Sequence, residues 1–190
     1  MERQGWSVML AAATDESVAV SAVADLGWHL AEELGREVLL VDGSFGDRGL
    51  SKVLGDGAGP GLMGLLEGVE LDGFDAETVW SATRPTRHPD VRFLGRGHGD
   101  NGRFVAARPD LLRGFLAAAT QLSDYVLVQC APILQPGRSL AFGGLVDAAL
   151  VVALEHETRV DELERANLML SGCGARRVGL VLASRGSPRA

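Results

Sequence analysis

The chain has 190 residues, 46% of them hydrophobic and 23% charged, which is enough for the core of one soluble α/β domain. No linker divides it, so residues 1–190 are expected to form a single domain. Its net charge of −7 disfavours nucleic-acid binding, and no apolar run is long enough to span a membrane. Because residues 1–4 lead into a strand, not a signal peptide, we expect a cytoplasmic protein without direct membrane insertion. Cys130, Cys173 and the scattered histidines offer no zinc site.

The first elements in the chain predict a strand, a helix and a second strand. Residues 7–12 and 37–42 are mostly apolar, as in strands covered on both faces, and the second run ends at Asp42. Between them, apolar residues recur at helical spacing over residues 17–34. This unit predicts a mainly parallel sheet with helices on both faces. The loop after the first strand, and the glycine-rich residues 43–49 after the second, lie where such sheets bind ligands.

The later elements follow from the same patterns. Helices are predicted over residues 50–54, 61–68, 109–122, 139–146 and 160–170, and strands over residues 79–83, 91–94, 125–129, 148–153 and 178–182. Residues 74–77 fit neither pattern. Residues 97–102 match G-x-G-x-x-G, but they do not join a first strand to a helix. We therefore interpret them as a loop and not as a dinucleotide site.

The loop after the first strand lacks the residues that bind nucleotide. A phosphate loop needs glycines, a lysine and a hydroxyl group for magnesium, whereas residues 13–19 contain no glycine and Lys52 is the only lysine in the chain. Asp15 and Glu16 place negative charges where phosphates would bind, and each such contact costs on the order of a few kcal/mol. The sequence predicts the scaffold of a nucleotide site without its binding groups.

Three stretches of the chain match motifs of one family. Residues 38–55 are similar to V-L-L-[IV]-D-A-D-L-R-x-P-x-L-H-K-x-F-G, residues 60–68 to P-G-L-x-x-x-L-x-G, and residues 124–128 to the start of D-Y-V-I-I-D-T-P-P. The chain thus resembles the cytoplasmic kinase domain of bacterial tyrosine kinases (BY-kinases) from exopolysaccharide systems, relatives of the MinD/ParA P-loop ATPases. The resemblance implies a three-layer α/β sandwich with a mainly parallel sheet, of the P-loop NTPase type.

The positions that would bind ATP depart from this family pattern, with one exception. Ala19 and Val20 stand where the lysine and hydroxyl residue of the phosphate loop belong, and Ser44 and Gln129 replace two aspartates. Only Asp42 remains. The resemblance therefore implies a vestigial site with no catalytic residue, no cofactor and no metal. Its residues would be Ser17, Ala19, Val20, Ser21, Asp42, Ser44 and Gln129.

These losses predict a catalytically inactive, pseudokinase-like adaptor in exopolysaccharide biosynthesis and export. The resemblance implies that it binds the cytoplasmic part of a polysaccharide co-polymerase, a membrane protein that would recruit it to the inner face of the membrane. The sequence leaves open whether the protein forms a homo-oligomer. It also leaves open three alternatives: an atypical ATPase or tyrosine kinase that still binds ATP with magnesium, a MinD/ParA-like positioning protein, and an anion site made of Arg96, Arg103 and Arg108.

Asp15 and Glu16 also suggest how the vestigial site is closed. Without phosphate, these carboxylates can accept N–H bonds at the N-terminus of the helix over residues 17–34, with Thr14 or Asp15 as the N-cap. We expect the loop to be ordered without a ligand and to leave too little room for a triphosphate.

Overall fold

The computed structural model describes residues 4–55, 59–68, 73–98, 108–135 and 140–184, and their strands form one seven-stranded sheet. The strand order is β3-β4-β2-β5-β1-β6-β7, and all neighbouring pairs are parallel except β3 and β4. The strands are β1 (Trp6–Ala12), β2 (Val38–Gly43), β3 (Arg84–Pro85), β4 (Val91–Leu94), β5 (Tyr125–Cys130), β6 (Ala148–Leu154) and β7 (Val178–Ala183). The predicted mainly parallel α/β sheet is confirmed.

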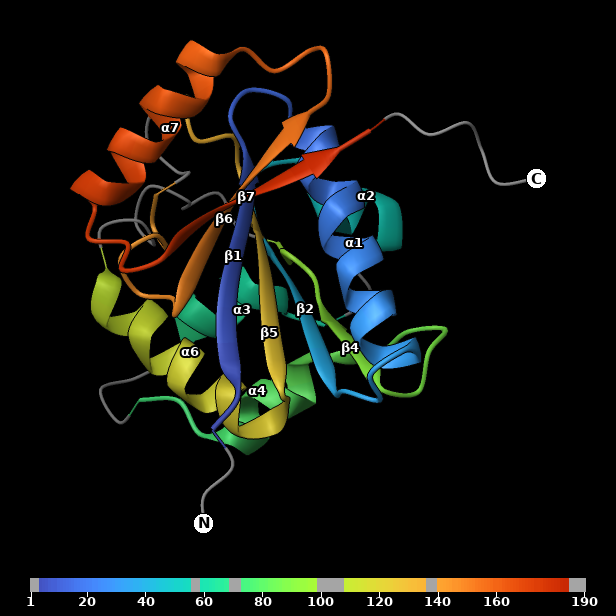
Figure 1. The fold of residues 1–190 in the computed structure, drawn as a ribbon. Coiled ribbons are helices and arrows are strands. Elements are labelled where there is room, and N and C mark those ends of the chain that lie inside the picture. Colours follow the sequence, from blue (N-terminus) through green and yellow to red (C-terminus); the bar gives the residue numbers. More distant parts are fainter. Residues whose placement is uncertain (1–3, 56–58, 69–72, 99–107, 136–139, 185–190) are drawn as a thin grey trace.

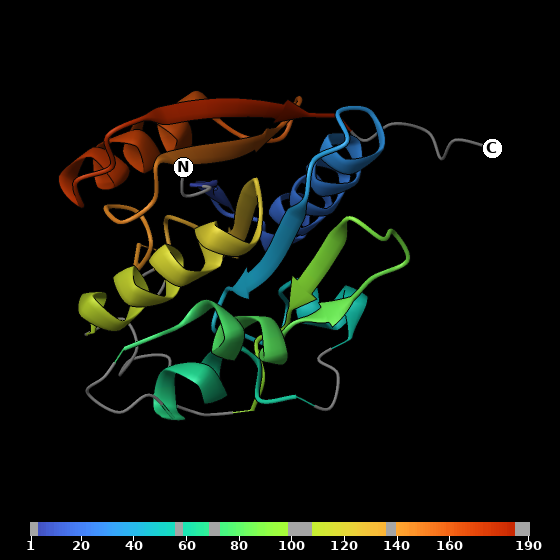
Figure 2. The ribbon, with the colours of Figure 1, turned by 90° about the horizontal axis from the view of Figure 1, so that it is seen from below.

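Helices cover both faces of this sheet, as Figures 1 and 2 show. The helices are α1 (Glu16–Glu32), α2 (Leu50–Leu54), α3 (Gly61–Gly68), α4 (Ala76–Ala82), α6 (Pro109–Leu122) and α7 (Val160–Gly172). One core cluster joins α1 and α2 to one face of the sheet, and a second joins α3, α4, α6 and α7 to the other. Met9 and Leu10 belong to opposite clusters because successive side chains of a strand point to opposite faces. The apolar runs of the sequence therefore reflect burial on both faces.

Two predicted elements are wrong. Of the strand expected over residues 79–83, residues 79–82 lie in α4 and Thr83 is its C-cap. The Asp75 side chain caps the start of this helix by accepting the Thr78 N–H at 2.6 Å. The short run of apolar and polar residues is compatible with a strand or a helix, and the N-terminal cap favours the helix. The helix expected over residues 139–146 is also absent, because residues 140–145 form turns and residue 139 lies outside the described residues. This segment contains Gly143 and Gly144, and glycine is unfavourable inside a helix.

The sheet brings the ends of three strands together at the site. β5 lies between β1 and β2, and Gln129 of β5 is in register with Asp42 of β2 and Leu10 of β1. In parallel strands all carboxyl ends meet at one edge of the sheet, so the loops after β1, β2 and β5 are neighbours.

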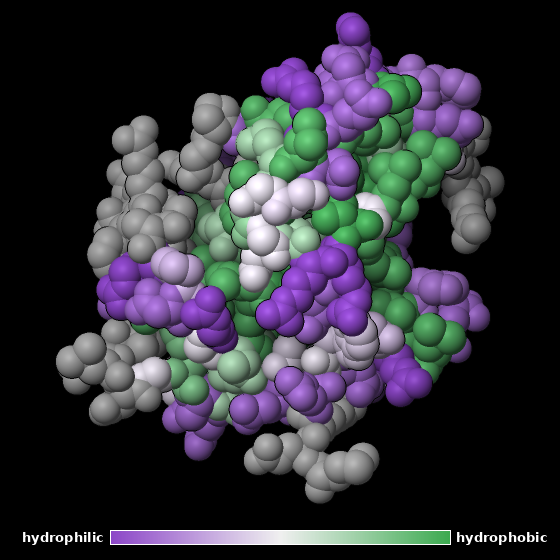
Figure 3. Space-filling view, turned by 60° about the vertical axis from the view of Figure 1, so that its left-hand side comes forward, coloured by the Kyte–Doolittle hydropathy of each residue, from purple (hydrophilic) through white to green (hydrophobic). Residues whose placement is uncertain are grey.

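The surface is not uniformly polar. Figure 3 shows hydrophobic residues beside hydrophilic ones on one face of the molecule. Exposed large apolar side chains include Leu34, Val160, Leu168, Leu180 and Leu182. Within the described part of the chain, no helix combines the length and apolar character needed to cross a membrane.

Candidate functional site

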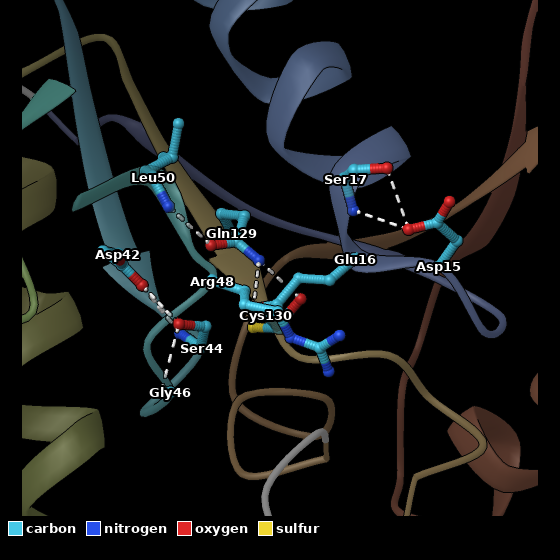
Figure 4. A network of polar contacts seen from close by, with 10 residues as sticks. All are labelled: Asp15, Glu16, Ser17, Asp42, Ser44, Gly46, Arg48, Leu50, Gln129 and Cys130. Carbon is cyan, nitrogen blue, oxygen red and sulfur yellow. Dashed lines mark hydrogen bonds and ion pairs between the residues drawn. The ribbon is translucent and has the colours of Figure 1, made fainter. Parts of the chain in front are cut away.

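Asp15 follows the loop after β1 and caps α1 (Figure 4). Its Oδ1 accepts hydrogen bonds from the Ser17 backbone N–H at 3.0 Å and from the Ser17 hydroxyl at 2.8 Å. A side-chain cap of this kind contributes about 1 kcal/mol, and a negative charge at the helix N-terminus adds a favourable interaction with the helix dipole. The expected capping of this helix by the chain itself is confirmed for Asp15.

Asp42, at the end of β2, is fully buried and holds the following loop. Its Oδ1 accepts hydrogen bonds from the Ser44 N–H at 3.1 Å and the Ser44 hydroxyl at 2.7 Å, while Oδ2 accepts the Ser51 N–H at 2.7 Å. A Cβ atom on Gly49 would collide with both the Asp42 carboxylate and the Ser44 hydroxyl. The retained carboxylate is thus enclosed by its own loop, which is possible because position 49 has no side chain.

Asp42 and Gln129 together cap α2. The residue before this helix is Gly49, which has no side chain to cap it. Instead, Gln129 Oε1 accepts the Leu50 N–H at 3.1 Å, and Asp42 accepts the Ser51 N–H. Two donors that a helix N-terminus leaves unpaired are therefore bonded by side chains from β5 and β2.

Glu16 lies over this network and is mostly buried. Its Oε1 lies 3.5 Å from the Nε2 of Gln129, which also donates to the Cys130 carbonyl at 2.9 Å, and its Oε2 lies 3.7 Å from the Nε of Arg48. The expectation that Glu16 would bond the N-terminus of α1 is thus wrong, since its side chain turns toward β5 and the loop after β2.

The surroundings of Glu16 change its acidity. Burial raises the pKa of Glu16 above its usual value of 4.5, and the negative charge of Asp42 raises it further. The contacts with Gln129 and Arg48 oppose this shift without cancelling it. Arg48 is largely exposed, so its ion pair with Glu16 contributes little energy.

A hollow of about 470 Å³ opens beside Glu16. Its lining includes Glu16, Asp47, Arg48, Ser44 and Gln135. The expectation that the closed loop leaves too little room for a triphosphate is therefore not supported by the volume. The described lining side chains carry a net negative charge, because they include two carboxylates, Glu16 and Asp47, and one arginine, Arg48.

The predicted vestigial residues separate into two groups. Asp42, Ser44 and Gln129 meet at the ends of β2 and β5, as described above. Ala19 and Val20 are instead buried in the core between α1 and the sheet, and Ser21 is exposed on α1. Ser17 is exposed and bonded to Asp15. The geometry of α1 explains why these residues lie away from Asp42 and Gln129. Each residue advances by 100° around the helix axis, and only the first turn lies at the ends of the strands.

The anion site suggested by the arginines is not assembled in the described residues. Arg96 pairs with Asp47 at 3.2 Å, Arg108 pairs with Asp110 at 2.9 Å, and Arg103 lies outside the described residues. In the G-x-G-x-x-G stretch, residues 99–102 also lie outside them. Gly97 has a positive φ of 77°, and a Cβ there would collide with the Pro60 carbonyl. Gly97 therefore serves a close backbone contact.

Two other kinds of site concern the described residues, a reactive thiol and a metal site. Cys130 is buried, and burial together with the charge of Asp42 raises the pKa of its thiol, which disfavours a nucleophilic thiolate. Among those residues, no three His, Cys, Asp or Glu side chains gather in a way that could hold a metal ion.

Sequence reasoning missed the roles of Arg48, Gly49 and Ser51. Arg48 approaches Glu16, Gly49 gives room to Asp42, and Ser51 supplies a backbone donor and accepts the Arg96 N–H at 2.8 Å. A usable signal was present, because a short predicted helix preceded by glycine has no N-cap side chain and needs acceptors from elsewhere in the chain.

Solved structures of several proteins share this architecture. The kinase domain of the Escherichia coli tyrosine kinase ETK matches with a TM-score of 0.79 at 19% identity, covering 100% of this chain and 71% of that chain. The VpsO kinase domain matches with a TM-score of 0.78 at 19% identity, covering 97% of this chain and 87% of that chain. The MinD cell division protein of Aquifex aeolicus matches with a TM-score of 0.68 at 20% identity, covering 94% of this chain and 69% of that chain. No protein-family model and no curated protein matches the chain. The chain therefore has the fold that bacterial tyrosine kinase domains share with MinD-type P-loop proteins.

Proposed function

We propose that this protein is a catalytically inactive, BY-kinase-like adaptor in exopolysaccharide biosynthesis and export. The observation that carries the proposal is the network at the ends of β2 and β5. There Asp42 and Gln129 cap α2, and the Glu16 side chain lies over Gln129. Groups that would have to face a nucleotide are bonded within the chain.

The residues present do not fit ATP with magnesium. The β1–α1 loop offers no glycine or lysine, and Asp15 and Glu16 begin α1. A triphosphate in the hollow would meet the carboxylates of Glu16 and Asp47, with Arg48 as the opposing charge in its lining. At an effective dielectric near 20, a close like-charge contact costs about 4 kcal/mol, which outweighs one exposed arginine.

The adaptor role rests on the fold and on the resemblance together. Structural neighbours are kinase domains of tyrosine kinases, including BceF as well as ETK. We propose that the chain acts as one domain in the cytoplasm and retains the docking function of such domains without their chemistry. Its partner would be the cytoplasmic part of a polysaccharide co-polymerase.

Calorimetry with MgATP tests the inactive site. We expect no binding and no hydrolysis at physiological magnesium concentration. A micromolar dissociation constant that Asp42→Ala abolishes would overturn the proposal. Because Asp42 is structural here, this variant must first be shown to be folded by circular dichroism.

A substitution in the hollow tests the adaptor role in cells that lack the parent gene. A Cβ at Gly46 has open space, and its nearest neighbour is the Ser44 carbonyl at 3.8 Å. Gly46→Glu would therefore add a third carboxylate to the hollow without disturbing the core. We expect this variant to restore polymer yield and to bind the cytoplasmic segments of the co-polymerase as the parent does. Failure of the parent to bind those segments would refute the adaptor role.

The hollow itself favours a second class of candidate, a nucleotide-binding protein, either an atypical ATPase or a MinD-like positioning protein. Its volume of about 470 Å³ falls in the range of small-molecule sites. In that case Gly46→Glu would remove both nucleotide binding and cellular function, whereas an adaptor, which binds no nucleotide, would keep its cellular function. The same variant thus separates the two candidates.

A further inference from the structure

The two edges of the sheet are built very differently. β3, at one edge, is two residues long and consists of Arg84 and Pro85. β7, at the other edge, has six residues, Val-Gly-Leu-Val-Leu-Ala, with no charge and no proline. Proteins protect edge strands from pairing by keeping them short and by placing charges or proline in them. β3 has all of these features and β7 has none, so among the residues that the structure describes β7 forms an open edge.

The hydrogen bonds of β7 show which backbone groups face outward. The carbonyls of Arg177 and Ala183 both accept N–H groups from the β6 side, from Ala149 and Glu155 at 2.8 Å each. In a parallel pair, alternate residues bond to a given neighbour, so the odd-numbered residues of β7 face β6. The N–H and C=O groups of residues 178, 180 and 182 point away from the sheet.

Two of the residues whose backbone groups point away from the sheet also carry large, exposed apolar side chains. Leu180 and Leu182 are 59% and 64% exposed, although they sit in the middle and near the end of a regular strand. Because side chains alternate between faces, both project from one face of the sheet. Within the described part of the chain, this edge therefore combines backbone groups that pair with no neighbouring strand and exposed apolar side chains on one face.

We propose that β7 pairs with β7 of a second copy of this chain, antiparallel and centred on Leu180. A twofold axis at this residue places Leu180 opposite its own copy and Val178 opposite Leu182. Each of these pairs exchanges N–H···O=C bonds between outward-facing groups, and the apolar side chains cover each other across the axis. The two sheets become one continuous sheet.

The charges at the ends of β7 favour a second copy in this orientation. Arg176 is exposed just before the strand, and Glu155 is exposed beside its last residue, Ala183, which accepts the Glu155 N–H. In an antiparallel pair the beginning of one strand lies beside the end of the other. Arg176 of each copy therefore approaches Glu155 of the other. The strand itself carries no charge that would repel its copy.

Sedimentation velocity from low to high micromolar protein tests this pairing, with two oppositely charged variants. We expect the full chain to form a concentration-dependent dimer. Leu180→Lys and Leu180→Glu should each raise the dimer dissociation constant by roughly fivefold or more, because like charges then lie directly opposite each other. An equimolar mixture of the two variants should restore the dimer through a Lys–Glu pair.

Leu34→Lys is the matched control. Leu34 is 57% exposed, nearly the same as Leu180, but it lies between α1 and β2 and away from the β7 edge. We expect this variant to dimerise like the parent and all variants to keep the parent circular dichroism spectrum. A parent that stays monomeric would overturn the proposal. So would a loss of dimer in Leu34→Lys equal to that in Leu180→Lys, or a mixture of the charged variants that stays monomeric.

Discussion

Replacing Asp42 with alanine should destabilise the protein strongly, because this carboxylate holds the loop after β2 and the start of α2. The change removes the acceptor of the Ser44 N–H, the Ser44 hydroxyl and the Ser51 N–H. The hydroxyl can rotate to another acceptor, but the two N–H groups stay buried without an acceptor. Each such unpaired group costs about 1 to 3 kcal/mol of stability. We expect the free energy of unfolding to fall by about 2 to 6 kcal/mol, the combined cost of these two unpaired N–H groups.

Urea unfolding followed by circular dichroism measures this loss, and a thermal scan should show a melting temperature roughly 10 °C lower for a chain of this size. Asp42→Asn keeps one oxygen acceptor and should lose roughly half as much. Asp25→Ala removes an exposed carboxylate of α1 and should change stability by at most about 0.5 kcal/mol. A loss below about 1 kcal/mol in Asp42→Ala would refute a structural role. A gain in stability would instead fit an acid kept for ligand binding.

Three further predictions concern the residues around this network. The raised pKa of Glu16 means that the folded protein holds this proton more tightly than the unfolded chain, so stability falls as pH rises above about 4.5. Glu16→Gln should therefore be more stable than the parent at neutral pH, with the difference vanishing at pH 4.5 and below. Asp15→Ala combined with Glu16→Ala should lower stability by at most about 1 kcal/mol through the lost cap, and it should not create ATP binding in calorimetry. In the folded protein a thiol reagent should modify the partly exposed Cys173 but not the buried Cys130, whose thiol pKa is raised.

Each of these predictions has an opposing outcome. If Glu16→Gln were less stable than the parent at neutral pH, the ionised carboxylate would be stabilising and its burial would not dominate. Tight ATP binding by the double variant would show that the carboxylates alone block the site. Modification of both thiols at equal rates under native conditions would mean that β5 opens readily.

The sequence alone was enough for the parallel strands of the sheet and for the Asp15 cap of α1. Strands such as β1 and β2 are apolar on both faces, and that pattern is written in consecutive residues. The Asp15 cap was also predictable, because its acceptor and its donor in Ser17 are two residues apart. Local patterns failed where they were short, as in α4, whose residues fit a strand equally well until the Asp75 cap is considered.

The arrangement of the site was decided by the tertiary structure. The bond from the Leu50 N–H to Gln129 joins residues 79 positions apart, and the approach of Gln129 to Glu16 spans 113 positions. The resemblance to BY-kinases marked Asp42, Ser44 and Gln129 as candidates, and parallel strand order brings them to one edge of the sheet. Asp42 and Gln129 cap α2, and the Glu16 side chain turns away from its own helix, only in the folded chain. Buried polar groups must find hydrogen-bond partners, and the fold decides which donors and acceptors lie within reach of each other.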